Sequence, residues 1–303
     1  PVFFMVLLGI ISRIKGFVTP EQKEGANNIV FNVLFPILIF NILLTSKIES
    51  SAILIVVYVF IAFVLTMFIG KLFTKFTGER FSHISYFMLT TCEGGNVALP
   101  LYTSIVGVAY ASNTVIFDLA GTLIAFVLIP IMVAKLNAGQ TSPKELAKTI
   151  FTNSFVIAVI LGLGLNLLGV YNMLAQTPFI DVYTNTINMI TGPIIGMILF
   201  IIGYNLKINM DTLGSLLKLL IVRIVLFAFV IVGFFVFFPH LMADKIYMLA
   251  VLIYFMCPTG FALPMQISPL FKSEEDNSYT AALISLNMVV TLIVYTVIVI
   301  FIV

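Results

Sequence analysis

Long apolar stretches, separated by short polar ones, run along the whole chain. Ten apolar segments lie near residues 2–14, 26–46, 51–73, 82–110, 112–134, 149–170, 178–204, 213–238, 246–271 and 277–303. A helix needs about 20 apolar residues to cross the hydrocarbon core of a bilayer, and most of these segments reach that length. The pattern therefore predicts an all-α polytopic membrane protein with ten transmembrane helices.

Composition supports a membrane protein and excludes several other classes. With 61% hydrophobic and 9% charged residues in 303 positions, the chain is too apolar for soluble domains of this length. Its net charge of +2 provides no basic surface for a nucleic acid. Cys92 and Cys257 fall in apolar segments, and His83 and His240 lack ligand-like spacing. We therefore expect no disulfide framework, no metal site, no cofactor and no nucleic-acid partner.

The start of the chain gives one further expectation. The first segment is short, and the chain begins with proline rather than methionine, so we expect residues to be missing from its front. A secretory signal is the alternative, but no basic stretch precedes the apolar run and no small-residue cleavage site follows Ile11.

The distribution of basic residues predicts the orientation in the membrane. If the N-terminus lies outside, the cytoplasmic ends collect 12 of the 15 basic residues, namely Arg13, Lys15, Lys23, Lys71, Lys75, Arg80, Lys135, Lys144, Lys148, Lys207, Lys218 and Lys272. Lys47 and Lys245 fall in outer loops, and Arg223 lies inside the eighth segment. Basic residues concentrate on the cytoplasmic side of membrane proteins. This bias predicts that both termini lie outside.

The longest polar stretch divides the ten segments into two groups of five. Because five is odd, the second group must enter the membrane from the side opposite to the first, which is the pattern of an inverted repeat. Ala98–Pro100 in the fourth segment is matched by Ala262–Pro264 at the corresponding place in the ninth. We therefore predict inverted repeats over residues 1–135 and 149–303, joined by a cytoplasmic linker at 136–148.

The two matched segments contain residues that interrupt a helix. The residues expected to break them are Gly94 and Pro100 in the fourth segment and Pro258 and Pro264 in the ninth. Backbone groups freed at membrane depth are tolerated only where protein or a water-filled cavity satisfies them. The sequence thus predicts crossed discontinuous helices four and nine. Simple kinks in packed helices are the alternative.

Paired broken helices are typical of the substrate site of secondary transporters. The helix N-termini near Val97 and Phe261 are candidate anion cradles, because the N-terminal end of a helix dipole is positive. Carbonyl groups in 93–95 and 257–259 are candidate cation ligands. The residues expected to line the substrate site are Gly95, Asn96, Thr259, Gly260 and, from the tenth segment, Asn287.

Two carboxylates within the apolar segments are candidates for ion coupling. At about 1.5 Å per residue, Glu93 lies roughly 16 Å into its segment and Asp118 roughly 9 Å. A charge at such depth is costly and indicates function by default. Either side chain could bind sodium, or carry a proton because burial disfavours the charged form; a neutral acid bonded to a neighbouring helix is the alternative. We expect Arg223, near the cytoplasmic face, to snorkel rather than reach a substrate carboxylate.

The opening of the chain resembles the auxin efflux carrier family. The resemblance rests on Gly9–Arg13 (GIISR) and on Asn27–Phe40 (NNIVFNVLFPILIF), and the two breaks look like that family's crossover helices. It implies a bacterial malate or malonate permease-like protein in the plasma membrane, with the fold of bile-acid sodium symporters. It also implies a scaffold of helices one, two, six and seven, a transport domain of the remaining helices, elevator-like motion and a homodimer. Plant members have a longer central loop and lack a carboxylate at the position of Glu93, which leaves the coupling open.

These observations predict a secondary transporter, and not an enzyme, that moves a small organic anion such as malate, malonate or an auxin-like acid. Its coupling ion would be sodium, bound at Glu93, or a proton. One alternative is a sodium/proton antiporter of the same fold, although that class is expected to carry two adjacent aspartates where Asp118 stands alone. The other is a non-transporting membrane sensor, which the short loops disfavour.

Overall fold

The computed structural model describes residues 2–45, 51–136, 144, 148, 152, 154–205, 213–261 and 263–302. Within these residues the chain forms helices and no strands, as expected. Six helical stretches are long and apolar enough to cross a membrane, namely Pro20–Thr45, Ala52–Leu72, Ser112–Val133, Phe179–Asn205, Leu213–Phe237 and Glu274–Phe301. The predicted linker lies outside the described residues except for 136, 144 and 148. The division into inverted repeats stays a prediction.

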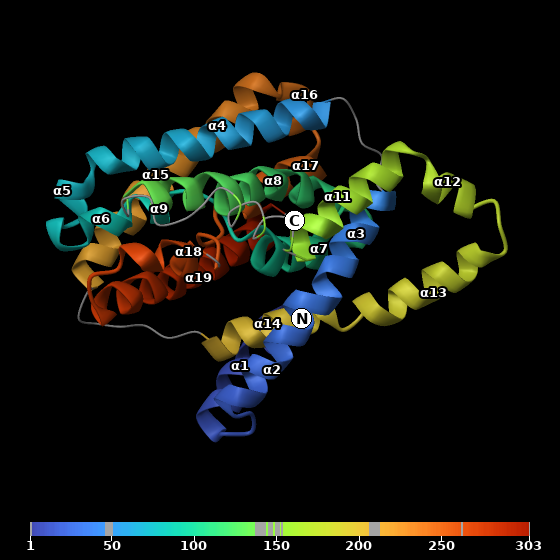
Figure 1. Cartoon of the computed structure of the whole chain (residues 1–303), viewed down its shortest axis with the longest axis horizontal. Helices are drawn as coiled ribbons and strands as arrows, with labels where there is room; N and C mark the ends of the chain where they lie inside the picture. The colour runs from blue at the N-terminus through green and yellow to red at the C-terminus, as the bar shows by residue number, and fades with distance from the viewer. Residues whose placement is uncertain are drawn as a thin grey trace. The chain divides into compact units, whose positions relative to one another are not determined.

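The chain forms two compact units, each built from two separate stretches (Figure 1). Unit 1 combines Pro1–Glu49 with Lys148–Leu206, and unit 2 combines Ser50–Ala147 with Lys207–Val303. Unit 1 thus contains the first, second, sixth and seventh apolar segments, and unit 2 contains the other six. These are the two groups into which the resemblance sorts the helices.

Unit 1 pairs helices from its two stretches. Its helices are α1 (Val2–Lys15), α2 (Pro20–Ile29), the π-helix η1 (Val30–Leu34), α3 (Phe35–Thr45), α11 (Ser154–Leu167), α12 (Val170–Leu174), α13 (Phe179–Thr191) and α14 (Ile194–Asn205). Helix α1 packs on α14, and α3 packs on α11. The Asn166 side chain donates 2.8 Å hydrogen bonds to the carbonyls of Leu43 and Leu44. This contact fixes the end of α3 against α11.

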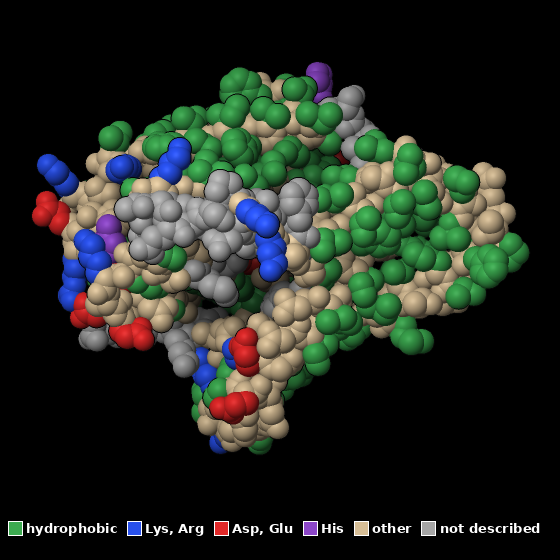
Figure 2. Space-filling model, viewed as in Figure 1, with side chains coloured by type: hydrophobic (Ala, Val, Ile, Leu, Met, Phe, Trp, Pro, Cys, Tyr) green, Lys and Arg blue, Asp and Glu red, His purple; other side chains and the backbone are tan. Residues whose placement is uncertain are grey.

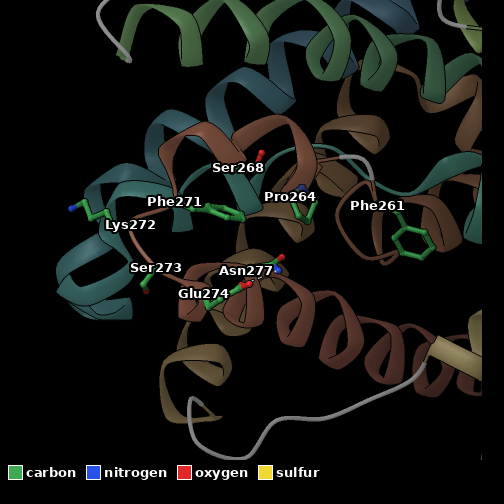
Figure 3. A pocket seen from close by; sticks show the side chains of 8 residues that line it. All are labelled: Phe261, Pro264, Ser268, Phe271, Lys272, Ser273, Glu274 and Asn277. Atoms are coloured by element: carbon green, nitrogen blue, oxygen red, sulfur yellow. Dashed lines mark hydrogen bonds between the residues drawn. The ribbon is translucent and has the colours of Figure 1, made fainter. Parts of the chain in front are cut away.

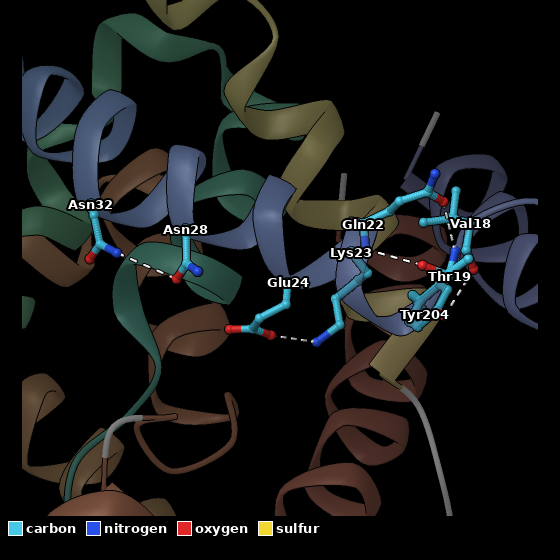
Figure 4. Close-up of polar contacts among 8 residues, drawn as sticks. All are labelled: Val18, Thr19, Gln22, Lys23, Glu24, Asn28, Asn32 and Tyr204. Carbon is cyan, nitrogen blue, oxygen red and sulfur yellow. Dashed lines mark hydrogen bonds and ion pairs between the residues drawn. The ribbon is translucent and has the colours of Figure 1, made fainter.

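Helix α2 begins earlier than the apolar pattern indicates, because its first turn is polar. Thr19 and Gln22 form a capping box, in which each side chain accepts a hydrogen bond from the other's backbone N–H, and Pro20 occupies the first turn. Figure 4 shows this turn together with the Lys23–Glu24 ion pair and the bond from Tyr204 to the Val18 carbonyl. The helix therefore starts at Pro20, six residues before the predicted start.

Two glycines allow the close approach of α1 and α14. A Cβ atom on Gly9 would collide with the Phe200 carbonyl oxygen, and one on Gly203 would collide with the Val6 carbonyl oxygen. Both obstacles are backbone atoms within helices, which cannot rotate away as a side chain can. Small residues at such positions let membrane helices pack closely.

Replacing Gly203 with alanine should therefore destabilise unit 1. We expect a loss of about 1–3 kcal/mol, because the new methyl group forces α1 and α14 apart. The matched control is Gly164→Ala in α11, where no atom lies within 4 Å of the new Cβ and alanine favours the helix. Thermal melting of both variants in detergent checks this expectation. Equal melting temperatures would contradict it.

Unit 2 contains the remaining helices and the two interrupted segments. They are α4 (Ser51–Leu72), α5 (Thr74–Thr77), η2 (Glu79–Phe81), α6 (Ser82–Ser85), η3 (Phe87–Leu89), η4 (Gly94–Ala98), α7 (Leu99–Val106), η5 (Val108–Tyr110), α8 (Ser112–Leu123), η6 (Ile124–Leu128), α9 (Ile129–Leu136), α15 (Leu213–Phe237), α16 (Pro239–Met242), α17 (Lys245–Phe255), α18 (Leu263–Ile267), η7 (Ser268–Leu270) and α19 (Glu274–Phe301). Helix α19 begins three residues before the predicted start, with three acidic residues in its first turn, where a helix dipole favours negative charge.

An aromatic cluster fixes the end of α17. The Phe255 ring lies 5.4–6.1 Å, between centroids, from the rings of Phe63, Phe117, Phe227 and Phe234. These rings come from α4, α8 and α15. Phe255 is the last residue of α17, so the cluster holds the helix where the chain leaves it.

Charged side chains gather at one end of unit 2. Figure 2 shows them around α5, α6 and the start of α19, with hydrophobic side chains over α4. At this end Arg80 pairs with Glu275, and the His83 ring nitrogen lies 3.0 Å from the buried carboxylate of Asp276. The Asp276 carboxylate also accepts a 2.7 Å hydrogen bond from the Lys272 backbone. These contacts join the start of α19 to the segment that leads into α6.

Candidate functional site

The fourth segment is interrupted at Thr90–Glu93. The 3-10 helix η3 ends at Leu89, and helical structure resumes with η4 at Gly94. Thr91 has a φ of 51°, a left-handed conformation that is strained for a β-branched residue. Pro100 lies in the first turn of α7, where proline is tolerated. The break therefore lies before the glycines and the proline that predicted it.

The ninth segment is interrupted in a similar way. Helix α17 ends at Phe255, and α18 begins at Leu263 with Pro264 in its first turn. Pro258 lies between the two helices, and Ala262 lies outside the described residues. Both predicted breaks are thus present. We call Thr90–Glu93 and Cys257–Phe261 the first and second breaks.

Hydrogen bonds join the two breaks directly. The Glu93 N–H donates to the Pro258 carbonyl at 2.7 Å, and the Thr259 hydroxyl donates to the Thr90 carbonyl at 2.9 Å. The Gly260 N–H donates to the Thr91 hydroxyl at 3.4 Å. Unit 2 therefore holds two interrupted helices in contact at their breaks, as the sequence predicts. We call this region the crossing.

The Glu93 carboxylate lies between the starts of the two following helical stretches. One oxygen accepts a 3.4 Å hydrogen bond from the Asn96 N–H, and the other accepts one from the Phe261 N–H. The side chain is 8% exposed. Glu93 therefore occupies the position that the sequence assigned to a substrate anion near Val97 and Phe261.

Asp118 reaches the crossing from α8. Its carboxylate accepts a 3.2 Å hydrogen bond from the Tyr254 hydroxyl and faces the backbone N–H groups of Gly94 and Gly95. A Cβ atom on Gly94 would collide with the Asp118 carboxyl group. The two acidic residues thus flank the same first turn of η4, which N–H donors make favourable for carboxylates.

Arg223 is buried at the crossing, and the prediction that it snorkels is wrong. It lies ten residues into α15, or about 15 Å from the start of the helix, and is 4% exposed. Its guanidinium donates to the carbonyls of Met88 at 3.2 Å, Thr90 at 3.4 Å, Thr91 at 2.8 Å and Cys257 at 3.0 Å. It is too deep to reach a surface, and nearby carbonyl groups replace the water that its charge would need.

These contacts change the interpretation of the freed carbonyls. The sequence assigned carbonyl groups in 93–95 and 257–259 to a bound cation. Of these, the Cys257 carbonyl accepts a hydrogen bond from Arg223, as does the carbonyl of Thr91, two residues before Glu93. The guanidinium also lies 4.2 Å from the centroid of the Phe227 ring, a favourable distance for a cation over an aromatic face. One side chain of α15 thereby fixes both breaks.

Asn287 is buried on α19 close to the crossing. The Thr291 hydroxyl, one turn farther along α19, donates a 2.7 Å hydrogen bond to the Met256 carbonyl. Residues four apart share a helix face, so Asn287 lies on the same face. Its side-chain amide nitrogen is buried without a hydrogen-bond partner among the described residues, which leaves a donor for a ligand.

A pocket of about 640 Å³ lies beside the second break (Figure 3). The lining residues are Phe261, Pro264, Ser268, Phe271, Lys272, Ser273, Glu274 and Asn277. They come from the second break, α18, η7, the connection from η7 to α19 and the start of α19, and the labelled side chains extend from Phe261 to Lys272. The pocket therefore begins at the residue whose N–H binds Glu93, and Lys272 with Glu274 at the start of α19 forms its other side.

The structure brings together most of the residues that the sequence singled out. Those at the crossing are Glu93, Gly94, Gly95, Asn96, Asp118, Pro258, Thr259 and Gly260. Thr90, Thr91 and Tyr254 also lie at the crossing although the sequence did not indicate them, and Arg223 lies in an environment other than the predicted one. Thr90 and Thr91, directly before the glycines, and the arginine within an apolar segment were the available signals. The roles of all these residues remain predictions.

Comparison with known proteins supports the resemblance in the first half of the chain. No curated protein matches the chain. Residues 1–148 match the family model described as membrane transport protein. This match includes the first break and Asp118, and ends before α11. Residues 1–148 are therefore similar to the membrane transport protein family, that of the auxin efflux carriers.

Proposed function

We propose that this membrane transporter is a secondary transporter that moves a small organic anion by alternating access at the crossing. The observation that carries the proposal is the contact between two interrupted helices, through the Glu93 N–H, the Thr259 hydroxyl and the Gly260 N–H. Interrupted helices that meet in this way supply backbone N–H and carbonyl groups to a bound ion or substrate.

The proposed substrate site combines backbone and amide groups. Gly95 and Asn96 contribute the backbone of the first turn of η4, and Thr259 and Gly260 contribute the backbone of the second break. Asn287 contributes its amide nitrogen, which has no partner among the described residues. Glu93 and Asp118 are the proposed coupling residues, for sodium or for a proton. Malonate, malate and indole acetate are the proposed substrates, because each carries a carboxylate suited to N–H donors.

Two further features of the proposal concern motion and assembly. Unit 2 contains the crossing, and unit 1 contains the helices that the resemblance assigns to a scaffold. We propose that unit 2 moves as the transport domain of an elevator and that unit 1 forms the homodimer contact. The charged end of unit 2, with Lys71, Lys75 and Arg80, would face the cytoplasm of a bacterial cell, and both termini would lie outside.

Uptake into proteoliposomes tests the proposal. We expect the chain to accumulate at least one of the three acids above the level in protein-free liposomes. Asn287→Leu should lower uptake at least about tenfold, because about 1.4 kcal/mol of lost binding is a factor of ten. The matched control on α19 is Thr296→Val. Among the described residues, the Thr296 hydroxyl bonds only to the Leu292 carbonyl of its own helix. Folded protein that binds an acid but moves none would favour a sensor instead.

A sodium/proton antiporter is the second candidate. It is favoured by the two acidic residues, Glu93 and Asp118, that flank Gly94 at the crossing. Sodium-driven proton movement in the same liposomes, without uptake of any acid, would establish it in place of the anion transporter.

A further inference from the structure

The donors best placed to bind a substrate carboxylate already bind one. The Asn96 N–H belongs to η4, directly after the first break, and the Phe261 N–H to the second break, and both donate to the Glu93 carboxylate. Two donors on one carboxylate from two separate segments form a fork that matches the two oxygens of the group. A substrate carboxylate has the same shape and charge as the Glu93 side chain. A substrate carboxylate could accept hydrogen bonds from these two N–H groups only if the Glu93 carboxylate no longer does.

The surroundings provide room and a further donor for a second acid. The pocket of about 640 Å³ reaches Phe261, and Figure 3 shows the Phe261 and Pro264 side chains at one end of it. The buried amide nitrogen of Asn287, which is 3% exposed, lacks a partner among the described residues. It is thus a donor that the internal carboxylate leaves unused.

The charges at the crossing do not accommodate an additional anion. The titratable and charged groups around Glu93 are Asp118 on α8, Arg223 on α15, Tyr254 on α17, and Cys92 and Cys257 at the breaks. Arg223 is the cation among these groups, and backbone carbonyls of both breaks already bind it. A substrate carboxylate would join Glu93 and Asp118 in a buried region, and like charges disfavour the ionised form.

We propose that a substrate carboxylate binds the Asn96 and Phe261 N–H groups by replacing the Glu93 carboxylate, which takes up one proton as it leaves. This inference rests on the proposed function and specifies its coupling. One substrate anion and one proton enter together: the proton forms an O–H bond on Glu93, and the N–H donors pass from one carboxylate to the other. The charge at the crossing then stays constant, and a monocarboxylate crosses without net charge.

Sodium has no place in this step. Four of the carbonyls expected to bind it already accept hydrogen bonds: Cys257 from Arg223, Pro258 from the Glu93 N–H, Glu93 from the Ala98 N–H and Gly94 from the Leu99 N–H. Arg223 is a fixed cation that remains at the crossing in both states. Binding should therefore be equal in sodium and in choline.

Calorimetry on the full chain in detergent tests the proposal, with indole acetate and malonate as probes. Titrations at one pH in two buffers of different ionisation enthalpy give the number of protons taken up per acid bound. We expect one proton for the wild-type chain, an apparent Kd for indole acetate that rises about tenfold per pH unit where Glu93 is ionised in the free protein, and no effect of sodium.

Two variants assign the proton. Glu93→Gln should bind indole acetate without proton uptake and with the same Kd across the pH range. His83→Gln, which removes a histidine at the charged end of unit 2, should take up one proton as the wild-type chain does. Proton uptake is measured on the wild-type chain itself, so the proposal can still be tested if the Glu93 variant fails to fold.

The outcomes separate this inference from the proposed function. Binding without proton uptake in the wild-type chain, unchanged proton uptake in Glu93→Gln, or a requirement for sodium overturns the exchange at Glu93 while leaving anion transport in place. If neither acid binds at any pH to folded protein, the proposed anion transport fails, and the exchange fails with it.

Discussion

Replacing Arg223 with methionine is expected to destabilise the protein more than any other single substitution at the crossing. Methionine keeps most of the apolar stem but removes every hydrogen bond of the guanidinium. The carbonyls of Met88, Thr90, Thr91 and Cys257 then lose a donor inside the protein. A buried polar group left without its partner costs about 1–3 kcal/mol, so a total loss above about 3 kcal/mol is expected.

Thermal melting in detergent measures this loss. A change of 1 kcal/mol shifts the melting temperature of a domain of this size by about 2–4 °C, so the shift should exceed about 6 °C. Arg223→Lys should fall between the wild-type chain and Arg223→Met, because an ammonium group lacks the planar fork that reaches both breaks. The control is Arg80→Met, which removes an exposed ion pair with Glu275 and should cost less than about 1 kcal/mol. A melting temperature for Arg223→Met equal to that of this control would show that Arg223 does not hold the breaks.

Replacing Gly94 with alanine is expected to separate Asp118 from the crossing. The added methyl group would collide with the Asp118 carboxyl group, so α8 must move or the first turn of η4 must open. Either change moves the Asp118 carboxylate away from the N–H groups of Gly94 and Gly95 that it caps. Loss of such a cap costs about 0.5–2 kcal/mol, and the displaced backbone adds to it. Uptake should fall at least about tenfold.

A double-mutant cycle distinguishes the collision from a general effect of alanine. Asp118→Ala removes the obstacle, so Gly94→Ala should cost much less in the Asp118→Ala background than in the wild-type chain. Gly214→Ala, at a position where nothing lies within 4 Å of the new Cβ, is the matched control and should not lower stability. Additive losses in the cycle would refute a direct contact between residues 94 and 118.

The apolar pattern of the sequence predicted the positions of the helices well, and the residues at which they begin and end less well. Every apolar segment has helical residues in the structure near its expected bounds, because length and hydrophobicity together determine a membrane helix. The early starts at Pro20 and Glu274 follow from polar first turns, which an apolar pattern does not include. Their capping box and acidic residues are visible in the sequence and could have corrected the ends.

The candidate site was predictable in its members but not in their partners. The glycines and prolines of the sequence indicated where both helices are broken. Because a proline is tolerated in the first turn of a helix, the prolines mark helix starts, and the breaks lie just before Gly94 and Leu263. The carboxylate of Glu93 was expected to bind an ion, whereas it binds the N–H groups expected to bind a substrate. Arg223 was expected to reach the surface. Such pairings depend on which residues of α15 and the breaks lie at the same depth, and a single sequence does not contain that information.

The division of the chain into two interleaved units has a consequence for biosynthesis. Unit 1 is complete only when the ribosome has passed Leu206, and unit 2 only when it has reached the end of Val303. When synthesis has reached Ala147, the nascent chain contains one stretch of each unit and the whole of neither. The first break, with Thr91, Glu93 and Gly94, therefore enters the membrane before Arg223 and the second break have been made. Until then the translocation machinery or the lipid headgroups must satisfy the polar backbone groups of the first break. The interval between synthesis of the two halves is therefore the stage at which misfolding is most expected.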